Sequence, residues 1–536
     1  MLLAIAAAAL LVRLFFIRVH PVNYDGYWHV FIARNLSREL GALAHPPLYP
    51  LLLRRADAVA HTRLSYLSIS LVSGVAAVVL VASVLAGIAA RREMPLVGAL
   101  ALALSPNAIA LSGIAESYML CTAFVLAATR AYLDLIVPAP PEKRGRSAAA
   151  FSVWASLALL THYAAGLFLL ATAAAPFVLA ALEPGYRRRW TGSSATRVAA
   201  AFLPPLFVAA ALFHFLARAW VHRLSHVAEF YFAVGRETIP AYLARALAGT
   251  FVLFSPVAVG SPPAAAAALL AFLAAVVAIA VRADRRRGDS GAPAATPAVL
   301  LVLLVGIEAA AGIAGRYPFG GGMRHQFLLL LFALLAGAAA FDRVLAGQPR
   351  GTRSALVALA VAAVAANSWA HRDPRWRPRP EPFAAERERF DRDFPDATEV
   401  HVDQFNLVAF FAQHHDWDWR FLGTVGGHPS VERYRVSTSG RTIDLVAHRD
   451  FWNFDPASPA TSAALAGTSA AGASRDATLF AVRQSIPGEP APDPDAIRRR
   501  IPALAAGAGL ETGKVDVFPG GVFADFRRAA PTPPAP

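Results

Sequence analysis

The sequence predicts a polytopic α-helical membrane protein that ends in a small soluble α/β domain. Three observations support this fold class. Hydrophobic residues make up 56% of the 536 residues and charged residues only 16%, a larger apolar share than the cores of a soluble protein of this length require. The mean hydropathy is +0.46. Apolar stretches of membrane-span length recur as far as Ala370, and beyond that residue the pattern changes to short strands.

About eleven segments approach the roughly 20 mainly apolar residues that cross a bilayer. The first segment has no small-residue cleavage site after its apolar run, so we expect a retained helix and not a secretory peptide. The predicted spans are Leu2–Ile17, Tyr66–Ala90, Met94–Leu111, Tyr118–Ile136, Ala148–Leu160, Ala164–Leu182, Val198–Leu216, Thr250–Val281, Pro297–Ile313, Phe327–Leu345 and Ala355–Ala370.

Basic residues fall in or beside every second loop, which the positive-inside rule assigns to the cytoplasm. The N-terminus is then cytoplasmic, while the loop after the first span and the C-terminal tail face outward. The formal net charge is +14, but these arginines and lysines are scattered through short loops, so they indicate membrane lipids as partners and not nucleic acid. The single cysteine, Cys121, cannot form an internal disulfide.

The chain divides into a membrane domain, residues 1–370, and an external soluble domain, residues 371–536. The soluble domain begins with an Arg/Pro-rich linker, and its Pro-rich end, 529–536, is expected to be disordered. Between them lie segments that alternate or run apolar for the length of a strand. The predicted strands are 399–402, 431–436, 442–446, 477–482 and 515–517.

The most informative motif is the polar loop 20–29, which contains Asp25 and follows the first span directly. A carboxylate at this depth suits chemistry on a lipid-linked substrate, so Asp25 is the first catalytic candidate. The residues after it predict an amphipathic helix on the membrane surface, with Asp25 just before its first turn. Asp25 fits a simple helix cap equally well. The stripe on one face of this helix, apolar except for Asn35, is Trp28, Phe31, Ile32, Asn35, Leu36 and Leu40.

A second motif, His45-Pro-Pro-Leu-Tyr49, completes this outer loop. Its two prolines stiffen the chain, and residues 48–60 predict a second surface helix. Both His45 and Tyr49 would then lie near the membrane interface, where we assign them to substrate binding. Tyr49 also fits an ordinary interfacial aromatic residue.

Glu116 follows the third span and is therefore expected on the same face as Asp25. A carboxylate at the start of an apolar helix is costly unless it is paired or functional, and we interpret it as a second catalytic acid that orients Asp25, a cation or the substrate. A helix cap fits the same position. Two nearby outward residues, Tyr118 and His162, are assigned to substrate binding, although His162 also fits a packing histidine.

A later outer loop, Arg316-Tyr-Pro-Phe-Gly-Gly-Gly-Met-Arg324-His325, combines glycines with two flanking arginines. Glycines allow backbone N–H groups to approach an anion, and guanidinium groups pair with phosphate oxygens. Arg316 and Arg324 are therefore candidate phosphate ligands, and a tight turn with interfacial arginines is the alternative. Two charged residues within spans, Arg13 and Glu308, fit structural pairing as well as catalysis.

No metal site is predicted. His222 and His226 have the i, i+4 spacing of a zinc pair on a helix, but Glu229 is the only further ligand type close to them in the sequence.

Together, the outward Asp25, the following helix, the His45–Tyr49 motif and about eleven spans before a soluble domain resemble the GT-C-fold integral membrane glycosyltransferases. The nearest groups are the protein O-mannosyltransferase-like and lipid A aminoarabinose transferase-like enzymes. The resemblance covers roughly 2–370, and the family carries a segment comparable to 317–324. Gly26 stands where the family often has a second carboxylate, which argues against a paired-acid role in the first loop.

This resemblance implies hexosyl or pentosyl transfer, with inversion, from a polyprenyl-phosphate sugar donor to a glycan, lipid or protein acceptor. Asp25 would act as general base while cations stabilise the departing lipid phosphate. A divalent cation is compatible with this chemistry, and no other cofactor is implied. The Ala/Arg-rich composition is typical of a bacterial chain, so the site would face outward from the cytoplasmic, or inner, membrane.

Two other function classes remain open at this point. Many spans with a few buried charges also fit a transporter or flippase for a lipid or small solute. Such proteins usually show corresponding helix breaks in two halves of the chain, and no such symmetry is seen here. A receptor or assembly factor that uses its tail is the third class, and it would not need Asp25.

Overall fold

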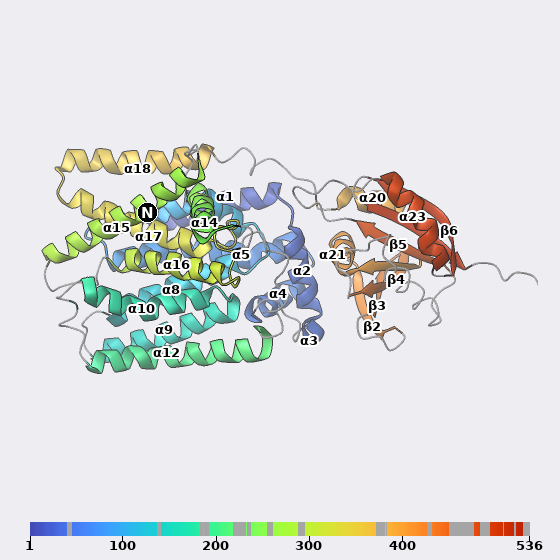
Figure 1. The fold of residues 1–536 in the computed structure, drawn as a ribbon, viewed down its shortest axis with the longest axis horizontal. Coiled ribbons are helices and arrows are strands. Elements are labelled where there is room, and N and C mark those ends of the chain that lie inside the picture. The colour runs from blue at the N-terminus through green and yellow to red at the C-terminus, as the bar shows by residue number, and fades with distance from the viewer. Residues whose placement is uncertain are drawn as a thin grey trace, which may run out of the picture. The chain divides into compact units, whose positions relative to one another are not determined.

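In the computed structural model, the chain forms two compact units (Figure 1). One comprises Met1–Val22 and Ile32–Arg379, and the other comprises Asn23–Phe31 and Pro380–Pro536. The first is helical and the second is built on a β-sheet. The structure describes residues 1–39, 46–136, 141–182, 186, 192–217, 232, 237–254, 261–287, 295–370, 381, 383–425, 431–449, 476–482, 494–507, 509–518 and 521–528.

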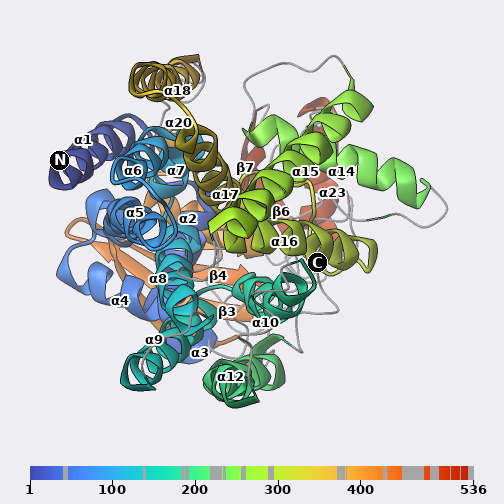
Figure 2. The ribbon, with the colours of Figure 1, turned by 90° about the vertical axis from the view of Figure 1, so that its left-hand side faces the viewer.

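Most of the predicted spans are helices of the first unit (Figure 2). Within the described ranges, eight helices are long and apolar enough to cross a membrane, or nine if α6 and α7 form one bent span. These match nine of the predicted spans. The helices of this unit are α1 (Leu2–Val19), the end of α2 (Tyr24–Arg34), α3 (Leu36–Glu39), α4 (Leu48–Val59), α5 (Arg63–Ala86), α6 (Met94–Leu104), α7 (Pro106–Ser112), α8 (Tyr118–Ile136), α9 (Pro141–Thr161), α10 (Ala165–Leu182), α12 (Gly192–Leu212), the π-helical turn Phe213–Ala217, α14 (Ile239–Phe254), α15 (Pro262–Arg287), α16 (Thr296–Ile313), α17 (Phe327–Ala346) and α18 (Arg350–Ala370).

The eighth predicted span, Thr250–Val281, is wrong. Its described residues belong to two helices, α14, which ends at Phe254, and α15, which begins at Pro262. Pro262 and Pro263 stand in the first turn of α15, where the N–H group that a proline lacks would have no partner within the helix. The predicted span 148–160 falls on α9, which is not among the eight.

The third predicted span is bent by 61° between α6 and α7. Pro106 has no N–H to donate to the carbonyl of Leu102, so the helical hydrogen-bond pattern is interrupted there. Arg13 of α1 occupies this break. It is fully buried, and its guanidinium donates to the carbonyl oxygens of Ala103 at 3.1 Å and Leu102 at 3.4 Å and to Ser112 Oγ at 3.0 Å. Arg13 is therefore paired structurally.

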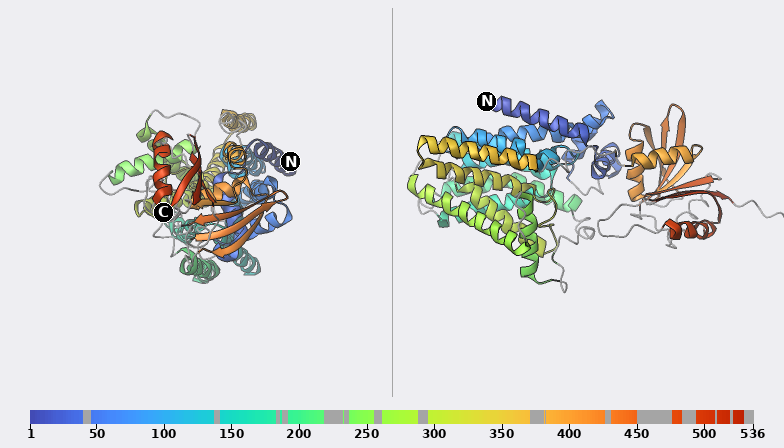
Figure 3. Two further views of the ribbon diagram at one scale, coloured as in Figure 1. Left: turned by 90° about the vertical axis from the view of Figure 1, so that its right-hand side faces the viewer. Right: turned by 90° about the horizontal axis from the view of Figure 1, so that it is seen from above.

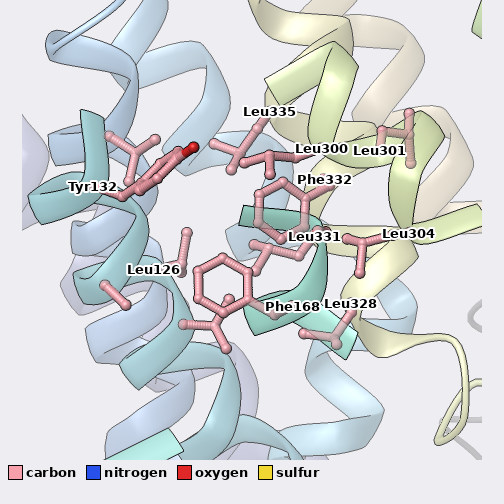
Figure 4. Close-up of a cluster of buried hydrophobic side chains, with 14 of the residues drawn as sticks. Leu126, Tyr132, Phe168, Leu300, Leu301, Leu304, Leu328, Leu331, Phe332 and Leu335 are labelled. Carbon is pink, nitrogen blue, oxygen red and sulfur yellow. The ribbon is translucent and has the colours of Figure 1, made fainter. Parts of the chain in front are cut away.

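The core of this unit is formed by large side chains from helices far apart in sequence (Figure 4). Phe168 of α10 stacks on Phe332 of α17, with ring centroids 5.9 Å apart. Tyr132 of α8 is fully buried, and its hydroxyl donates to the carbonyl of Thr172 at 2.8 Å. These contacts fix α8 and α17, and the candidate site lies at the start of these two helices.

The second unit contains a β-sheet (Figure 3). Its seven strands lie in the order β2-β3-β4-β1-β5-β7-β6. β1 is parallel to β4 and β5, and the other pairs are antiparallel. All five predicted strands are present, and β2 and β7 were not predicted. The elements are α20 (Ala384–Asp393), β1 (Glu399–Asp403), α21 (Gln404–Gln413), β2 (Asp418–Thr424), β3 (Val431–Thr438), β4 (Arg441–His448), β5 (Asp476–Val482), α23 (Pro494–Gly507), β6 (Leu510–Phe518) and β7 (Gly521–Arg528).

Helices cover both faces of this sheet. On one face, Phe390 of α20 and Phe410 of α21 meet Phe480 of β5 edge to face, at 5.3 and 5.5 Å. On the other face, α23 contributes Ile501 and Leu504 to a cluster with side chains from β5, β6 and β7. Alternate residues of the central strands thus fill two separate cores, as the two-residue period of a strand requires.

Candidate active site

Asp25 lies in the first turn of α2 and is half-buried. The sequence predicts Asp25 just before the helix, whereas in the structure it is the second residue of the helix. The N–H groups at a helix start favour a negative charge there, and this explains why a carboxylate is tolerated next to buried residues. This stretch, Asn23–Phe31, belongs to the unit that holds the β-sheet.

The prediction that the stripe of α2 lies against lipid is wrong. Phe31 is fully buried, and its ring contacts Phe411 at 5.5 Å, Tyr434 at 5.9 Å and Trp419 at 6.2 Å, all edge to face. Other side chains of the protein, and not lipid, therefore surround Phe31. Ile32 is also buried, in the other unit.

Glu116 and Arg324 form an ion pair in the helical unit. Arg324 Nη1 is 3.4 Å from both carboxylate oxygens of Glu116. Glu116 lies in the turn between α7 and α8, while Arg324 lies in the loop between α16 and α17. The side chain of Glu116 is 3% exposed and that of Arg324 is 39% exposed. The pair therefore places a partly exposed guanidinium beside a buried carboxylate.

The hydroxyl groups of Ser70 and Tyr49 support the turn that contains Glu116. Ser70 of α5 donates to the Glu116 carbonyl oxygen at 3.0 Å, and the Tyr49 hydroxyl is 3.5 Å from Ser70 Oγ. Tyr49 is fully buried, so in this structure it supports the turn and does not line an open surface. Burial raises the pKa of the Tyr49 hydroxyl, which keeps its proton at neutral pH.

Two further candidates, Tyr118 and His162, form an aromatic cluster with Phe327. The ring centroids are 5.0 Å apart for Tyr118 and His162, and each lies 5.5 Å from the centroid of Phe327. His162 Nδ1 accepts from the backbone N–H of Ala164 at 3.0 Å, so that nitrogen carries no proton in this geometry. These ring contacts hold the starts of α8 and α17 and the α9–α10 turn together. Phe327 was not predicted, because it reads as one more apolar residue of a span.

The glycines of the 316–325 loop have a packing role that was not predicted. Gly320 has a φ of +75°, and a Cβ there would be 2.4 Å from the Cα of Ala246 in α14. Gly321 donates its N–H to the Pro318 carbonyl at 3.1 Å, so this group is not open to an anion. The N–H group of Gly321 therefore does not support the predicted contact between the loop backbone and an anion. Close contact with α14 explains the glycine at position 320. Arg316 is exposed at the start of the same loop.

The remaining predicted residues add little to this site. His45 lies outside the described residues, as do His222 and His226. Glu308, in the middle of α16, is fully buried, and neither of its carboxylate oxygens has a hydrogen-bond partner among the described residues. Among the described residues, no group of three or more His, Cys, Asp or Glu side chains is arranged to hold a metal ion.

A polar cluster at the end of α2 was also missed. Arg34 donates to both carboxylate oxygens of Asp57 in α4, at 2.8 and 2.9 Å, and to the Tyr66 hydroxyl at 3.0 Å. His61 Nδ1 lies 2.9 Å from Asp57 Oδ1. Arg34 lies off the stripe predicted for α2, and no sequence motif links it to Asp57, 23 residues further along the chain.

Comparison with known proteins supports the fold. No protein-family model and no curated protein sequence matches the chain. Among solved structures, ArnT from Cupriavidus metallidurans bound to undecaprenyl phosphate aligns with a TM-score of 0.55 and 12% identity, over 98% of this chain and 97% of that one. Its apo form gives the same TM-score, with 13% identity and the same coverage.

A second solved structure, the Archaeoglobus fulgidus oligosaccharyltransferase in the apo form, aligns with a TM-score of 0.47 and 12% identity. That alignment covers 77% of this chain, which spans 64% of the length of the archaeal protein. The likeness to ArnT extends over both units, from the first helix to the C-terminal sheet. The chain therefore has the GT-C fold of membrane glycosyltransferases, followed by a small C-terminal sheet domain.

Proposed function

We propose that this protein transfers a sugar from a polyprenyl-phosphate donor to an acceptor on the outer face of the cytoplasmic membrane. The observation that carries the proposal is the Glu116–Arg324 pair, in which a partly exposed guanidinium lies beside a buried carboxylate just before the starts of α8 and α17. A cation in this setting suits a lipid phosphate. The bound undecaprenyl phosphate in ArnT, which shares the fold, supports the same class of donor.

In the proposed reaction, Asp25 takes the proton from an acceptor hydroxyl, and the acceptor oxygen forms a bond to the anomeric carbon. The bond from that carbon to the phosphate oxygen breaks, and the polyprenyl phosphate departs with the electron pair. Arg324, with Arg316 from the same loop, stabilises the charge that develops on the leaving phosphate. Glu116 holds Arg324 in place. Attack opposite to the leaving phosphate inverts the anomeric centre.

The remaining assignments belong to the same proposal. Tyr118 and His162 contact the sugar or its phosphate, and His45 does so from the first outer loop. The acceptor is a glycan, a lipid or a protein. The arginine distribution supports a cytoplasmic N-terminus, which puts the loops of Asp25, Glu116 and Arg324 on the outer face.

The test uses the full chain in lipid nanodiscs with a panel of polyprenyl-phosphate hexoses and pentoses and a crude envelope acceptor fraction. Release of polyprenyl phosphate is measured for wild type, Asp25→Asn and Arg324→Ala. Arg350→Gln is the matched control, because Arg350 is an exposed arginine at the start of α18, in a loop predicted to be cytoplasmic. We expect turnover by wild type and the control, a loss of at least about 100-fold in Asp25→Asn, and a raised KM in Arg324→Ala.

Turnover that Asp25→Asn retains would remove Asp25 from the role of base. Absence of turnover for every donor, with no donor raising the melting temperature, would overturn the proposal. Flux of a lipid-linked sugar across proteoliposomes in that case would instead support the transporter or flippase class.

A further inference from the structure

The sheet-bearing unit is built from two separate stretches of chain, and the shorter one, Asn23–Phe31, carries Asp25. Three side chains of this stretch, Tyr24, Tyr27 and Phe31, have the i, i+3, i+7 spacing that places them on one helix face. Each of them contacts aromatic residues between 383 and 434. The first turns of α2 thus belong to the helical layer on one face of the sheet.

Tyr24 makes the contacts nearest to Asp25. Its ring stacks on Phe405 of α21, with centroids 4.6 Å apart and planes inclined by 20°, and its edge meets Phe383 at 6.1 Å. The Tyr24 hydroxyl donates to the carbonyl oxygen of Phe405 at 3.1 Å. Burial, followed by the charges of Asp25 and Asp403, raises the pKa of Tyr24 well above its usual value, so the hydroxyl remains a donor.

The next turns repeat this attachment. Tyr27 is 1% exposed, its ring lies 5.3 Å from that of His415, and its hydroxyl donates to Glu381 at 3.4 Å. The ring of Phe31 contacts those of Phe411, Trp419 and Tyr434, as described above. Six ring contacts on one face of an eleven-residue helix leave it little freedom to turn about its axis.

We infer that the C-terminal domain holds the helix that carries Asp25, and that Tyr24 is the positioning residue for this carboxylate. The domain then sets the direction from which Asp25 meets a substrate, in addition to any contact that it makes with an acceptor. The consequence for sugar transfer rests on the proposed function. The attachment itself does not, and it is tested separately.

The first test is hydrogen exchange of the full chain in nanodiscs, comparing wild type with Tyr24→Ala and Tyr24→Phe. We expect Tyr24→Ala to lower the protection of amides 27–31 by about tenfold or more, since one stacked aromatic pair is lost with its burial. Tyr24→Phe keeps the ring and should restore most of the protection. Phe518→Ala is the control, because Phe518 packs on Phe523 in the same sheet without a ring contact to α2.

The inference is overturned if Tyr24→Ala leaves amides 27–31 as protected as in wild type. It is also overturned if Phe518→Ala lowers their protection to the same extent, since loss of domain stability alone would then account for the effect.

The second test probes position 25 without any substrate. In a Cys121→Ala background, Asp25→Cys places the chain's single thiol at the start of α2, and its alkylation rate is followed against pH. The helix N-terminus should lower the pH of half-maximal reactivity. Adding Tyr24→Ala should move this midpoint back toward that of free cysteine and change the rate at pH 7 by at least about threefold. Identical profiles with and without Tyr24→Ala would contradict the positioning role.

If the donor panel gives turnover, Tyr24→Ala should lower kcat while KM for the donor stays within about twofold, and Tyr24→Phe should recover most of kcat. A raised KM with unchanged kcat would count against positioning of the base. If wild type turns over no donor, the proposed function fails, and the exchange and alkylation experiments still decide the inference.

Discussion

Arg324 Nη1 lies 3.4 Å from the carboxylate of Glu116, although the two residues are 208 positions apart in the chain. The pair joins the turn before α8 to the loop before α17, next to the ring cluster of Tyr118, His162 and Phe327. Each partner comes from a loop that no local pattern connects with the other. Four of the eight residues predicted for the site are thereby brought together.

The first prediction concerns this pair. Arg324→Ala, Glu116→Gln and the double variant should show a coupling free energy on the order of 1–2 kcal/mol in thermal unfolding, because each single change removes the same contact. If the effects of the two single changes add up to that of the double variant within about 0.3 kcal/mol, the two side chains act independently. The cycle is measured in one lipid and at one ionic strength, since Arg324 is partly exposed to screening ions.

The second prediction concerns Arg13. Arg13→Met should destabilise the protein by about 2–3 kcal/mol, because charge-assisted hydrogen bonds to the carbonyls at the α6–α7 bend are lost in a buried setting. Arg18→Gln is the control, since Arg18 lies on the same helix and is exposed. Equal melting temperatures for Arg13→Met and wild type would show that the bend does not need the guanidinium.

The third prediction concerns glycine packing under the Arg324 loop. Gly320→Ala should lower stability by at least about 2 kcal/mol, because its φ is positive and the new methyl group would overlap the backbone of Ala246. Gly322→Ala has nothing within 4 Å of the new Cβ and should be tolerated. If Gly320→Ala melts with wild type, the loop does not rest on α14 as described.

The fourth prediction concerns pH. Burial by itself raises the pKa of Asp57, but the hydrogen bonds and charge of Arg34, together with His61, outweigh it and lower the pKa below the usual 3.8. A carboxylate with a lowered pKa contributes stability above its unfolded-state pKa and loses it as the pH falls through the folded value. The melting temperature of wild type should therefore decrease when the pH is lowered beyond about 4.

Asp57→Asn tests this assignment. The variant should melt below wild type at pH 7, and the difference between the two should shrink as the pH is lowered from 5 to 3. A difference that stays constant over this range would mean that the Asp57 carboxylate is not the group responsible.

Sequence patterns predicted the strands unevenly. The five predicted strands are present, whereas β2 and β7 were missed. β2 is an edge strand whose residues are alternately exposed and half-buried, so it needs few apolar residues. β7 lies between β5 and β6 with helices over both faces, so its apolar residues do not alternate with polar ones. β7 therefore lacks the period of two that is the main signal for a strand.

The fold class, most of the spans and five strands could be predicted from the residues alone, and the GT-C architecture was expected from the resemblance of the motifs to that family. These properties follow from hydropathy over a window of about 20 residues and from motifs of a few residues, which are local. The contact between Glu116 and Arg324, the role of Arg13 at a broken helix and the burial of Tyr49 were decided by tertiary structure alone. The same holds for α2, whose apolar stripe predicts burial but cannot say whether lipid or protein provides it. In the structure it is the C-terminal domain, more than 350 residues further along the chain, that covers Tyr24 and Phe31.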